Sequence, residues 1–271
     1  MQEAPMEIVR PWKGFDIRYA LFDFDGTISL IREGWQNIMI PYFVEVLRET
    51  GTRESEEELT ACVTDFVDTL TGKQTIFQCI RLDEEVTKRG GPHRPPLDYK
   101  HEYLRRLEVR IRSRKEALEQ GKADPEDYLV PGVRAFIDLL QENGIRCYLA
   151  SGTDEKDVVY EASLLGLEGV FAEGVHGAHD HMLTCSKELV IRDMLDREGI
   201  LPNQLVSFGD GYVEVELVAD LGGLAIGAAT NEHERRGIDG WKRSRLIAAG
   251  AHAIIPDFRQ KEAIFAAIKE G

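Results

Sequence analysis

Two carboxylates one residue apart follow a short apolar segment near the start of the chain. The stretch Ala20–Thr27 reads Ala-Leu-Phe-Asp-Phe-Asp-Gly-Thr, so Asp23 and Asp25 come where a buried strand stops. Alternate strand side chains point to opposite faces, so the two aspartates share one face. Carboxylates this close repel each other unless a cation lies between them. The alternative is a strand that ends in an ordinary polar turn, where Asp and Gly are common.

Later segments carry residues of matching chemistry. Ser151 and Asp210 each follow a short apolar run, and Lys187 begins a predicted helix. Glu214 lies one helical turn beyond Asp210. In open parallel sheets, ligands bind where the carboxyl ends of the strands meet, so we expect these groups at one edge.

The types of these groups indicate a metal ion and a phosphate. Carboxylate oxygens without His or Cys suit Mg²⁺ rather than zinc. The hydroxyl of Ser151, the ammonium of Lys187 and the N–H groups of Gly152 and Thr153, expected at a helix start, suit a phosphate.

Apolar runs and amphipathic segments alternate along most of the chain. This order predicts an α/β fold, a doubly wound parallel sheet of Rossmann-like type. Residues Trp35–Pro125 carry helical patterns only, directly after the first strand. We therefore expect a core made of residues 1–34 and 126–271, with residues 35–125 as an inserted all-helical domain. Two linkers would allow this insertion to move over the strand ends.

The ordered set of motifs resembles the haloacid dehalogenase superfamily of phosphohydrolases. The set comprises Asp23-Phe-Asp25-Gly-Thr27, Ser151, Lys187 and Gly209-Asp210-x-x-x-Glu214, and its order matches the four motifs of that superfamily. The helical block lies between the first two motifs, which is the position of the superfamily's helical cap.

The resemblance implies a role for each motif residue. Asp23 would attack phosphorus and form an aspartyl-phosphate, and Asp25 would protonate the leaving oxygen and then activate water. Ser151 and Lys187 would hold the phosphoryl group, together with the backbone of Gly152.

The resemblance also implies a bound Mg²⁺. The Asp23 carboxylate, the backbone carbonyl of Asp25 and the Asp210 carboxylate would hold it. Glu214 stands where the family often has Asp, so it either contacts the metal, through water for instance, or only orients another ligand.

By this resemblance, the acid at position 25 indicates a phosphatase or a phosphomutase, since relatives that cleave carbon–halogen or carbon–phosphorus bonds lack an Asp there. We expect an Mg²⁺-dependent phosphatase that acts on a small phosphorylated metabolite, with a sugar phosphate ahead of a nucleotide. A phosphomutase of the same superfamily is the alternative, and a catalytically silent binder of a phosphorylated ligand is another. The substrate, the pathway and the oligomeric state stay open.

Specificity for the leaving group is expected in the helical insertion. The polar segment Thr71-Gly-Lys-Gln-Thr75 lies between two predicted helices, and Arg81 follows it. Lys73, Gln74 and Arg81, with Gln78, could bind a polyhydroxylated or anionic group. The alternative is an ordinary turn between helices with a capping residue.

Composition limits the partners of the chain. Its 271 residues carry a net charge of −15, which argues against binding to nucleic acid or an anionic membrane. No apolar run is long enough to span a bilayer, and the first residues show no secretory pattern. The four cysteines are scattered without a Cys-x-x-Cys pair, so we expect reduced thiols and a cytoplasmic protein.

Two further polar segments have simpler interpretations. His176, His179 and His181, with Cys185 nearby, match no closed zinc site by their spacing, and a polar hairpin accounts for them. The segment Lys242-Arg-Ser-Arg245 is expected to be a solvated helix start rather than a phosphate-binding patch.

Overall fold

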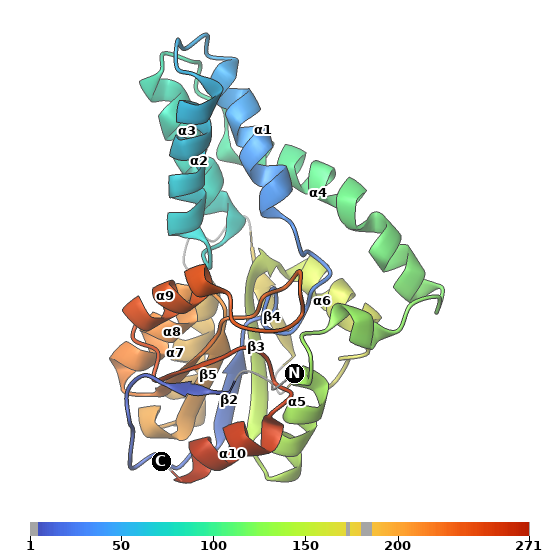
Figure 1. Ribbon diagram of the computed structural model, residues 1–271, viewed down its shortest axis with the longest axis vertical. Coiled ribbons are helices and arrows are strands. Elements are labelled where there is room, and N and C mark those ends of the chain that lie inside the picture. Colours follow the sequence, from blue (N-terminus) through green and yellow to red (C-terminus); the bar gives the residue numbers. More distant parts are fainter. Residues whose placement is uncertain (1–4, 172–173, 180–185, 271) are drawn as a thin grey trace.

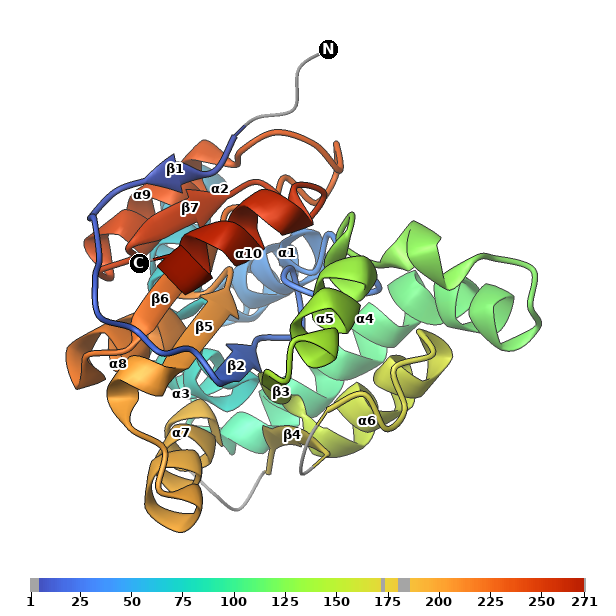
Figure 2. The same ribbon diagram turned by 90° about the horizontal axis from the view of Figure 1, so that it is seen from below.

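The computed structural model describes residues 5–171, 174–179 and 186–270. A seven-stranded sheet with the order β1-β7-β6-β5-β2-β3-β4 forms its centre (Figures 1 and 2). The strands are β1 (Glu7–Ile8), β2 (Tyr19–Phe22), β3 (Arg146–Asp154), β4 (Val175–Ala178), β5 (Leu205–Gly209), β6 (Leu224–Ala228) and β7 (Ala253–Ile255). Neighbours are parallel except for β1 and β7, so the predicted doubly wound α/β sheet is confirmed.

Strand β1 is a difference from the predicted sheet. It pairs antiparallel to β7, with Glu7 opposite Ile254. Two residues are too few to show an alternating pattern, so the sequence gives no signal for this edge strand.

Helices cover both faces of the sheet. Helices α5 (Val133–Glu142), α6 (Glu155–Leu164) and α10 (Lys261–Glu270) contribute to the core on one face, and α7 (Ser186–Glu198), α8 (Tyr212–Leu221) and α9 (Gly240–Ala248) cover the other. Side chains of β2 alternate between the faces: Phe22 stacks on Phe208 at 5.0 Å on the first face, whereas Leu21 belongs to the cluster of α7 and α8 on the second. Burial on both faces explains why the strands read as continuous apolar runs.

The connection from β2 to α5 carries the helical insertion. Its helices are α1 (Gln36–Arg48), α2 (Glu56–Leu70), α3 (Thr75–Lys88) and α4 (Pro96–Glu119), and a short 3₁₀ turn, η1 (Pro125–Tyr128), leads back to the core. Figure 1 shows α1, α2 and α3 standing beyond the carboxyl edge of the sheet, with α4 running down beside α6. Helix α2 begins at a capping box between Ser55 and Glu58, whereas α1 continues through Pro41.

Polar contacts join the insertion to the core. The buried ammonium of Lys100 on α4 pairs with Asp154 at the end of β3. The guanidinium of Arg245 on α9 donates to the backbone carbonyl of Asp68 in the last turn of α2, and it stacks on Trp241 at 4.6 Å. A cation near the last carbonyl groups of a helix stabilises that helix, so Arg245 stabilises the contact between α2 and the core.

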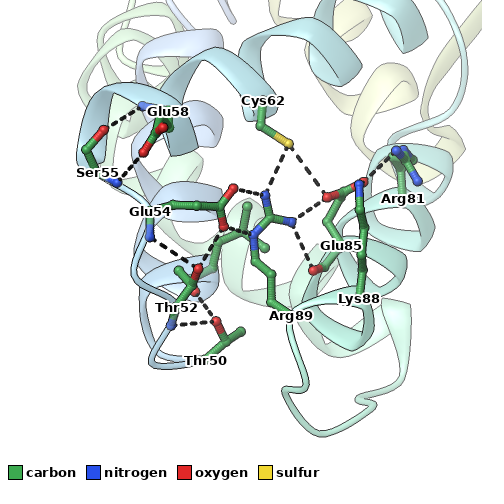
Figure 3. Close-up of polar contacts among 11 residues, drawn as sticks. Thr50, Thr52, Glu54, Ser55, Glu58, Cys62, Arg81, Glu85, Lys88 and Arg89 are labelled. Atoms are coloured by element: carbon green, nitrogen blue, oxygen red, sulfur yellow. Dashed lines mark hydrogen bonds and ion pairs between the residues drawn. The ribbon is translucent and has the colours of Figure 1, made fainter.

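Arg89 at the end of α3 is the centre of an ion-pair network inside the insertion (Figure 3). Its guanidinium bonds both oxygens of Glu54, at 2.5 and 2.8 Å, and also contacts Glu85. The Glu85 side chain is only 1% exposed, whereas Arg81, its other partner in the network, is 42% exposed. The network ties the loop before α2 to α3.

Arg89→Met is therefore expected to lower the free energy of unfolding by about 2 kcal/mol, because it leaves carboxylates of the network short of a partner. The matched change Arg81→Met removes an exposed partner of Glu85 and should cost less than about 1 kcal/mol. Urea unfolding followed by circular dichroism measures both. A cost for Arg89→Met no larger than that for Arg81→Met contradicts the prediction.

Candidate active site

Three neighbouring strands bring polar groups to the same edge of the sheet. Asp23 directly follows β2, Asp210 directly follows β5, and Ser151 lies within β3. The N–H of Asp23 donates to the carbonyl of Phe208 at 3.0 Å, so β2 stays paired with β5 up to this residue. These residues and others line one cavity of about 100 Å³ between the sheet edge and the insertion. The lining includes Asp23, Asp25, Arg32, Lys73, Gln78, Ser151, Gly152, Thr153, Lys187, Asp210 and Glu232.

Lys187 lies between two buried carboxylates. Its Nζ is 2.7 Å from Oδ2 of Asp23 and 2.6 Å from Oε2 of Glu214, and all three side chains are less than 10% exposed. Burial raises the pKa of Asp23 to about 6 and that of Glu214 to about 8, although Lys187 opposes both shifts. Burial alone would lower the pKa of Lys187, but the two carboxylates raise it, so its ammonium stays charged.

Asp25 is held by a separate set of contacts. Its Oδ2 accepts a hydrogen bond from Oγ1 of Thr153 at 2.7 Å, and its Oδ1 lies 3.8 Å from Nε of Arg32. The guanidinium of Arg32 in turn donates three hydrogen bonds to the carboxylate of Glu161 on α6, the shortest of 2.8 Å. Burial raises the pKa of Asp25 to about 6, against the effect of Arg32. The carboxyl group can therefore exchange its proton near neutral pH.

Asp210 faces a second buried lysine, Lys242. The Nζ of Lys242 lies 2.7 Å from Oδ2 of Asp210 and 2.6 Å from Oε1 of Glu232, in the loop after β6. Residue 242 is only 9% exposed, so the expectation of a solvated helix start is wrong for Lys242. It lies in the first turn of α9, where Asp239 caps the helix by accepting from its N–H.

The turn after β2 lies very close to the side chain of Asp210 at Gly26. Gly26 has a φ of +74°, and a Cβ placed on it would lie 2.2 Å from Oδ2 of Asp210. Glycine suits this position because any other side chain would be strained at the positive φ and would clash with Asp210. The Asp210 N–H donates to Oγ1 of Thr27 at 2.9 Å, which fixes the two turns together.

The donor types at this edge fit Mg²⁺. Carboxylate oxygens of Asp23 and Asp210 and the carbonyl of Asp25 are hard ligands, and the Gly26 turn provides close approach. Within the described ranges, no group of three Asp, Glu, His or Cys side chains could hold a metal ion. A cation here therefore needs the backbone carbonyl or water as well as the carboxylates.

Glu214 is the residue for which the sequence leaves two roles open. Its Oε2 bonds Lys187, and its Oε1 is buried without a hydrogen-bond partner. This contact favours the role of orienting Lys187 over direct contact with the metal.

The predicted phosphate-binding residues occupy the end of a strand. Ser151 is 1% exposed, and its Oγ accepts a hydrogen bond from the N–H of Thr153 at 3.0 Å. Strand β3 continues to Asp154, so the prediction that Gly152 and Thr153 open a helix is wrong by a few residues. The register of β3 against β4 shifts between Ala150 and Asp154, and Ser151, Gly152 and Thr153 within this segment line the cavity.

The four residues predicted to contact substrate from the insertion divide into two groups. Lys73 and Gln78 line the cavity. Gln74 is buried beside them as the residue before α3, and Arg81 pairs with Glu84 and Glu85, away from the cavity lining.

His176 and His179 are not among the residues that line the cavity. His179 faces Glu155, with 3.2 Å between Nε2 and Oε2. His181 and Cys185 fall outside the described residues.

Glu161 and Glu232 are carboxylates near this site for which the sequence analysis predicts no role. Glu232 follows β6 at the same sheet edge, so the rule that ligands bind at strand ends could have singled it out. Glu161 lies on α6 among residues of mixed polarity, and no local pattern marks it.

The comparisons agree with this fold and these motifs. The family model described as "Hydrolase: haloacid dehalogenase-like hydrolase" matches residues 17–222, and the chain therefore belongs to the haloacid dehalogenase-like hydrolases. No curated protein matches the chain. Among described residues, no helix has the length and apolar character needed to cross a membrane.

Solved structures of the same fold differ widely in sequence. A conserved haloacid dehalogenase-like protein of unknown function from Agrobacterium tumefaciens has a TM-score of 0.60 at 17% identity, covering 94% of this chain and 100% of its own. A β-phosphoglucomutase from Clostridium difficile has a TM-score of 0.59 at 14% identity, covering 94% and 98%. A predicted phosphoglycolate phosphatase from Haemophilus somnus has a TM-score of 0.59 at 15% identity, covering 92% and 98%.

Proposed function

We propose that this protein is an Mg²⁺-dependent phosphatase that hydrolyses a phosphate monoester of a small metabolite through an aspartyl-phosphate at Asp23. One observation carries the proposal: Asp23, Asp25, Ser151, Lys187 and Asp210 line a single cavity at the sheet edge. Membership of the hydrolase family agrees with it.

The residues divide the reaction into two steps. In the first, a carboxylate oxygen of Asp23 bonds to phosphorus while the bond from phosphorus to the leaving oxygen breaks, and Asp25 donates a proton to that oxygen. In the second, Asp25 accepts a proton from water, the water oxygen bonds to phosphorus, and the Asp23 carboxylate is released with inorganic phosphate.

The other groups stabilise charge during both steps. Lys187 keeps Asp23 in place and faces the phosphoryl oxygens, and the Ser151 hydroxyl can donate to one of them. The carboxylates of Asp23 and Asp210 and the backbone carbonyl of Asp25 would hold Mg²⁺, which would supply positive charge against the negative charge of the phosphate.

The insertion is proposed to act as a cap over this site. The α2–α3 loop touches the core backbone: a Cβ on Gly211 would lie 2.9 Å from Cα of Gly72. The cavity of about 100 Å³ is far smaller than the roughly 300–1,000 Å³ of typical small-molecule sites, so a metabolite enters only when the insertion moves away.

The test is Mg²⁺-dependent release of phosphate, first from a nitrophenyl phosphate and then across a panel of phosphorylated metabolites led by sugar phosphates. We expect turnover that stops when EDTA removes the metal and returns with Mg²⁺. Absence of metal-dependent turnover on every compound would support the catalytically silent binder instead.

A phosphomutase is the second candidate, because the Asp23 side chain is only 7% exposed and a mutase needs its phosphorylated aspartate protected from water while the substrate reorients. The two activities give different products from one sugar phosphate. Inorganic phosphate indicates the phosphatase, and an isomeric sugar phosphate without loss of phosphate indicates the mutase.

Lys73 is proposed to recognise the leaving group. It is exposed, lies on the loop that closes over the cavity and lines that cavity. Lys73→Ala should lower kcat/KM about tenfold for the best metabolite of the panel, while hydrolysis of the nitrophenyl phosphate barely changes.

Lys88→Ala is the control for Lys73→Ala, since Lys88 is 71% exposed at the opposite end of α3. It should leave both substrates unaffected. Equal loss on the two substrates with Lys73→Ala, or no loss on either, would show that Lys73 does not select the leaving group.

A further inference from the structure

Lys242 and Glu232 form a buried ion pair that the proposed reaction does not use. Lys242 belongs to α9, Glu232 to the loop after β6 and Asp210 to the end of β5, so three separate elements meet at one ammonium group. Lys242 is 11% exposed at its side chain and Glu232 is 18% exposed. Removing two charges from water is costly, and an arrangement of this kind needs a compensating role.

The ammonium group of Lys242 lies beside the proposed metal site. It contacts Oδ2 of Asp210 and Oε1 of Glu232. The same two atoms lie 2.2 and 3.1 Å from a Cβ placed on Gly26. Both carboxylates therefore lie over the turn that follows Asp25, where the carbonyl of Asp25 is a proposed metal ligand.

Electrostatics explains why a cation belongs there. Asp23, Asp25, Asp210 and Glu232 all line the cavity, and Lys187 is already shared between Asp23 and Glu214. Without another cation, Asp210 and Glu232 would repel each other in a poorly solvated place. The ammonium of Lys242 removes this repulsion when no metal is bound.

We propose that Lys242 is the resident counter-ion of the divalent-cation site, and that the incoming cation displaces it from Asp210 and Glu232, so that Glu232 becomes a further carboxylate of the site only then. The inference rests on the proposed Mg²⁺ dependence and extends it. Lys242 stabilises the metal-free protein and, for the same reason, weakens the binding of the cation.

Binding of Mn²⁺, followed by the loss of its free electron paramagnetic resonance signal, tests the inference without any turnover. Lys242→Met should bind Mn²⁺ at least about tenfold more tightly than the wild type, because a positive charge leaves the site. Glu232→Gln should bind it at least about tenfold more weakly.

The double variant shows whether Glu232 is a ligand of the cation or only the ion-pair partner of Lys242. If Glu232 binds the cation, Glu232→Gln/Lys242→Met binds Mn²⁺ at least about tenfold more weakly than Lys242→Met alone. If Glu232 only neutralises Lys242, its loss has no effect once Lys242 is gone, so the double variant binds Mn²⁺ as tightly as Lys242→Met alone, and this result overturns the role given to Glu232.

Thermal unfolding gives a second readout. Lys242→Met should have a lower Tm than the wild type in EDTA, and the difference should shrink or reverse with saturating Mn²⁺, since the metal replaces the lost charge. Lys115→Met is the matched control: Lys115 pairs with Glu108 on α4, and its loss changes the net charge equally. The control should alter neither the affinity for Mn²⁺ nor the response of Tm to it.

Unchanged Mn²⁺ affinity in Lys242→Met overturns the inference, as does absence of Mn²⁺ binding in both the wild type and this variant. Phosphate release by the wild type is judged separately. Metal-dependent release with no effect of Lys242→Met on Mn²⁺ binding rejects the inference alone. Tighter Mn²⁺ binding by Lys242→Met, with no turnover by the wild type on any phosphate ester, supports the inference and rejects the phosphatase.

Discussion

Replacement of Asp23 by Asn is expected to lower kcat for phosphate release by about 10⁵-fold. The amide keeps the shape of the side chain, but it is a poor nucleophile towards phosphorus. It also removes the negative partner of Lys187, 2.7 Å away. Release of phosphate from a nitrophenyl phosphate, in excess Mg²⁺, measures the loss.

The covalent step can be tested directly on the same variant. Wild-type protein quenched in acid during turnover should carry a phosphoryl group on the peptide that contains Asp23, detectable by mass spectrometry, and Asp23→Asn should carry none. Asp16→Asn is the control, since Asp16 is exposed, pairs with Arg18 and removes the same charge. Activity of Asp23→Asn within about tenfold of the wild type would rule out Asp23 as the nucleophile.

The fold was predictable because its signals are local. Each central strand is short, apolar and followed by polar or Gly residues, and each helix carries an apolar stripe, as Val133, Phe136, Ile137 and Leu140 do on α5. Asp23 and Asp210 directly follow their strands and Ser151 lies in the second half of β3, so the rule that ligands bind at the carboxyl edge predicts that these three residues lie together. The edge strand β1 lacks such a signal because two residues make its whole pairing.

The ion pairs of the site were less predictable, because they depend on side chains from distant elements. Lys187 and Lys242 both lie in the first turn of a helix, and sequence alone gives them the same appearance. The family motif marks Lys187, whereas nothing in the residues around Lys242 indicates that its ammonium is buried between Asp210 and Glu232. Burial of a charge is a property of the assembled fold, and local patterns do not encode it.

Lys187 and Arg32 also give the two acids of the first motif different surroundings. Asp23 bonds an ammonium group, as a nucleophile requires for its negative form, whereas Asp25 bonds the neutral hydroxyl of Thr153 and lies 3.8 Å from Arg32. Asp23 and Asp25 therefore differ in their partners, although burial raises the pKa of both to about 6. This difference leads to the second prediction, which concerns the proton that Asp25 transfers.

Asp25→Asn is expected to lower kcat by about 10³-fold for an alkyl phosphate, whose leaving oxygen needs a proton. A nitrophenolate leaves without one, so formation of the aspartyl-phosphate from nitrophenyl phosphate should be slowed only about tenfold. Hydrolysis of that intermediate still lacks its base. Stopped-flow absorbance should therefore show a burst of nitrophenolate, close to one equivalent of enzyme, before a slow steady rate.

Thr153→Val is the matched control for Asp25→Asn, because it removes the hydrogen bond of 2.7 Å to Asp25 but keeps the carboxyl group. It should slow both substrates by about tenfold or less and show no burst, since Asp25 can still activate water. A role for Asp25 in charge balance alone predicts equal losses on the two substrates and no accumulation of the intermediate. A burst confined to Asp25→Asn, with a loss that depends on the leaving group, assigns both proton transfers to this carboxyl group.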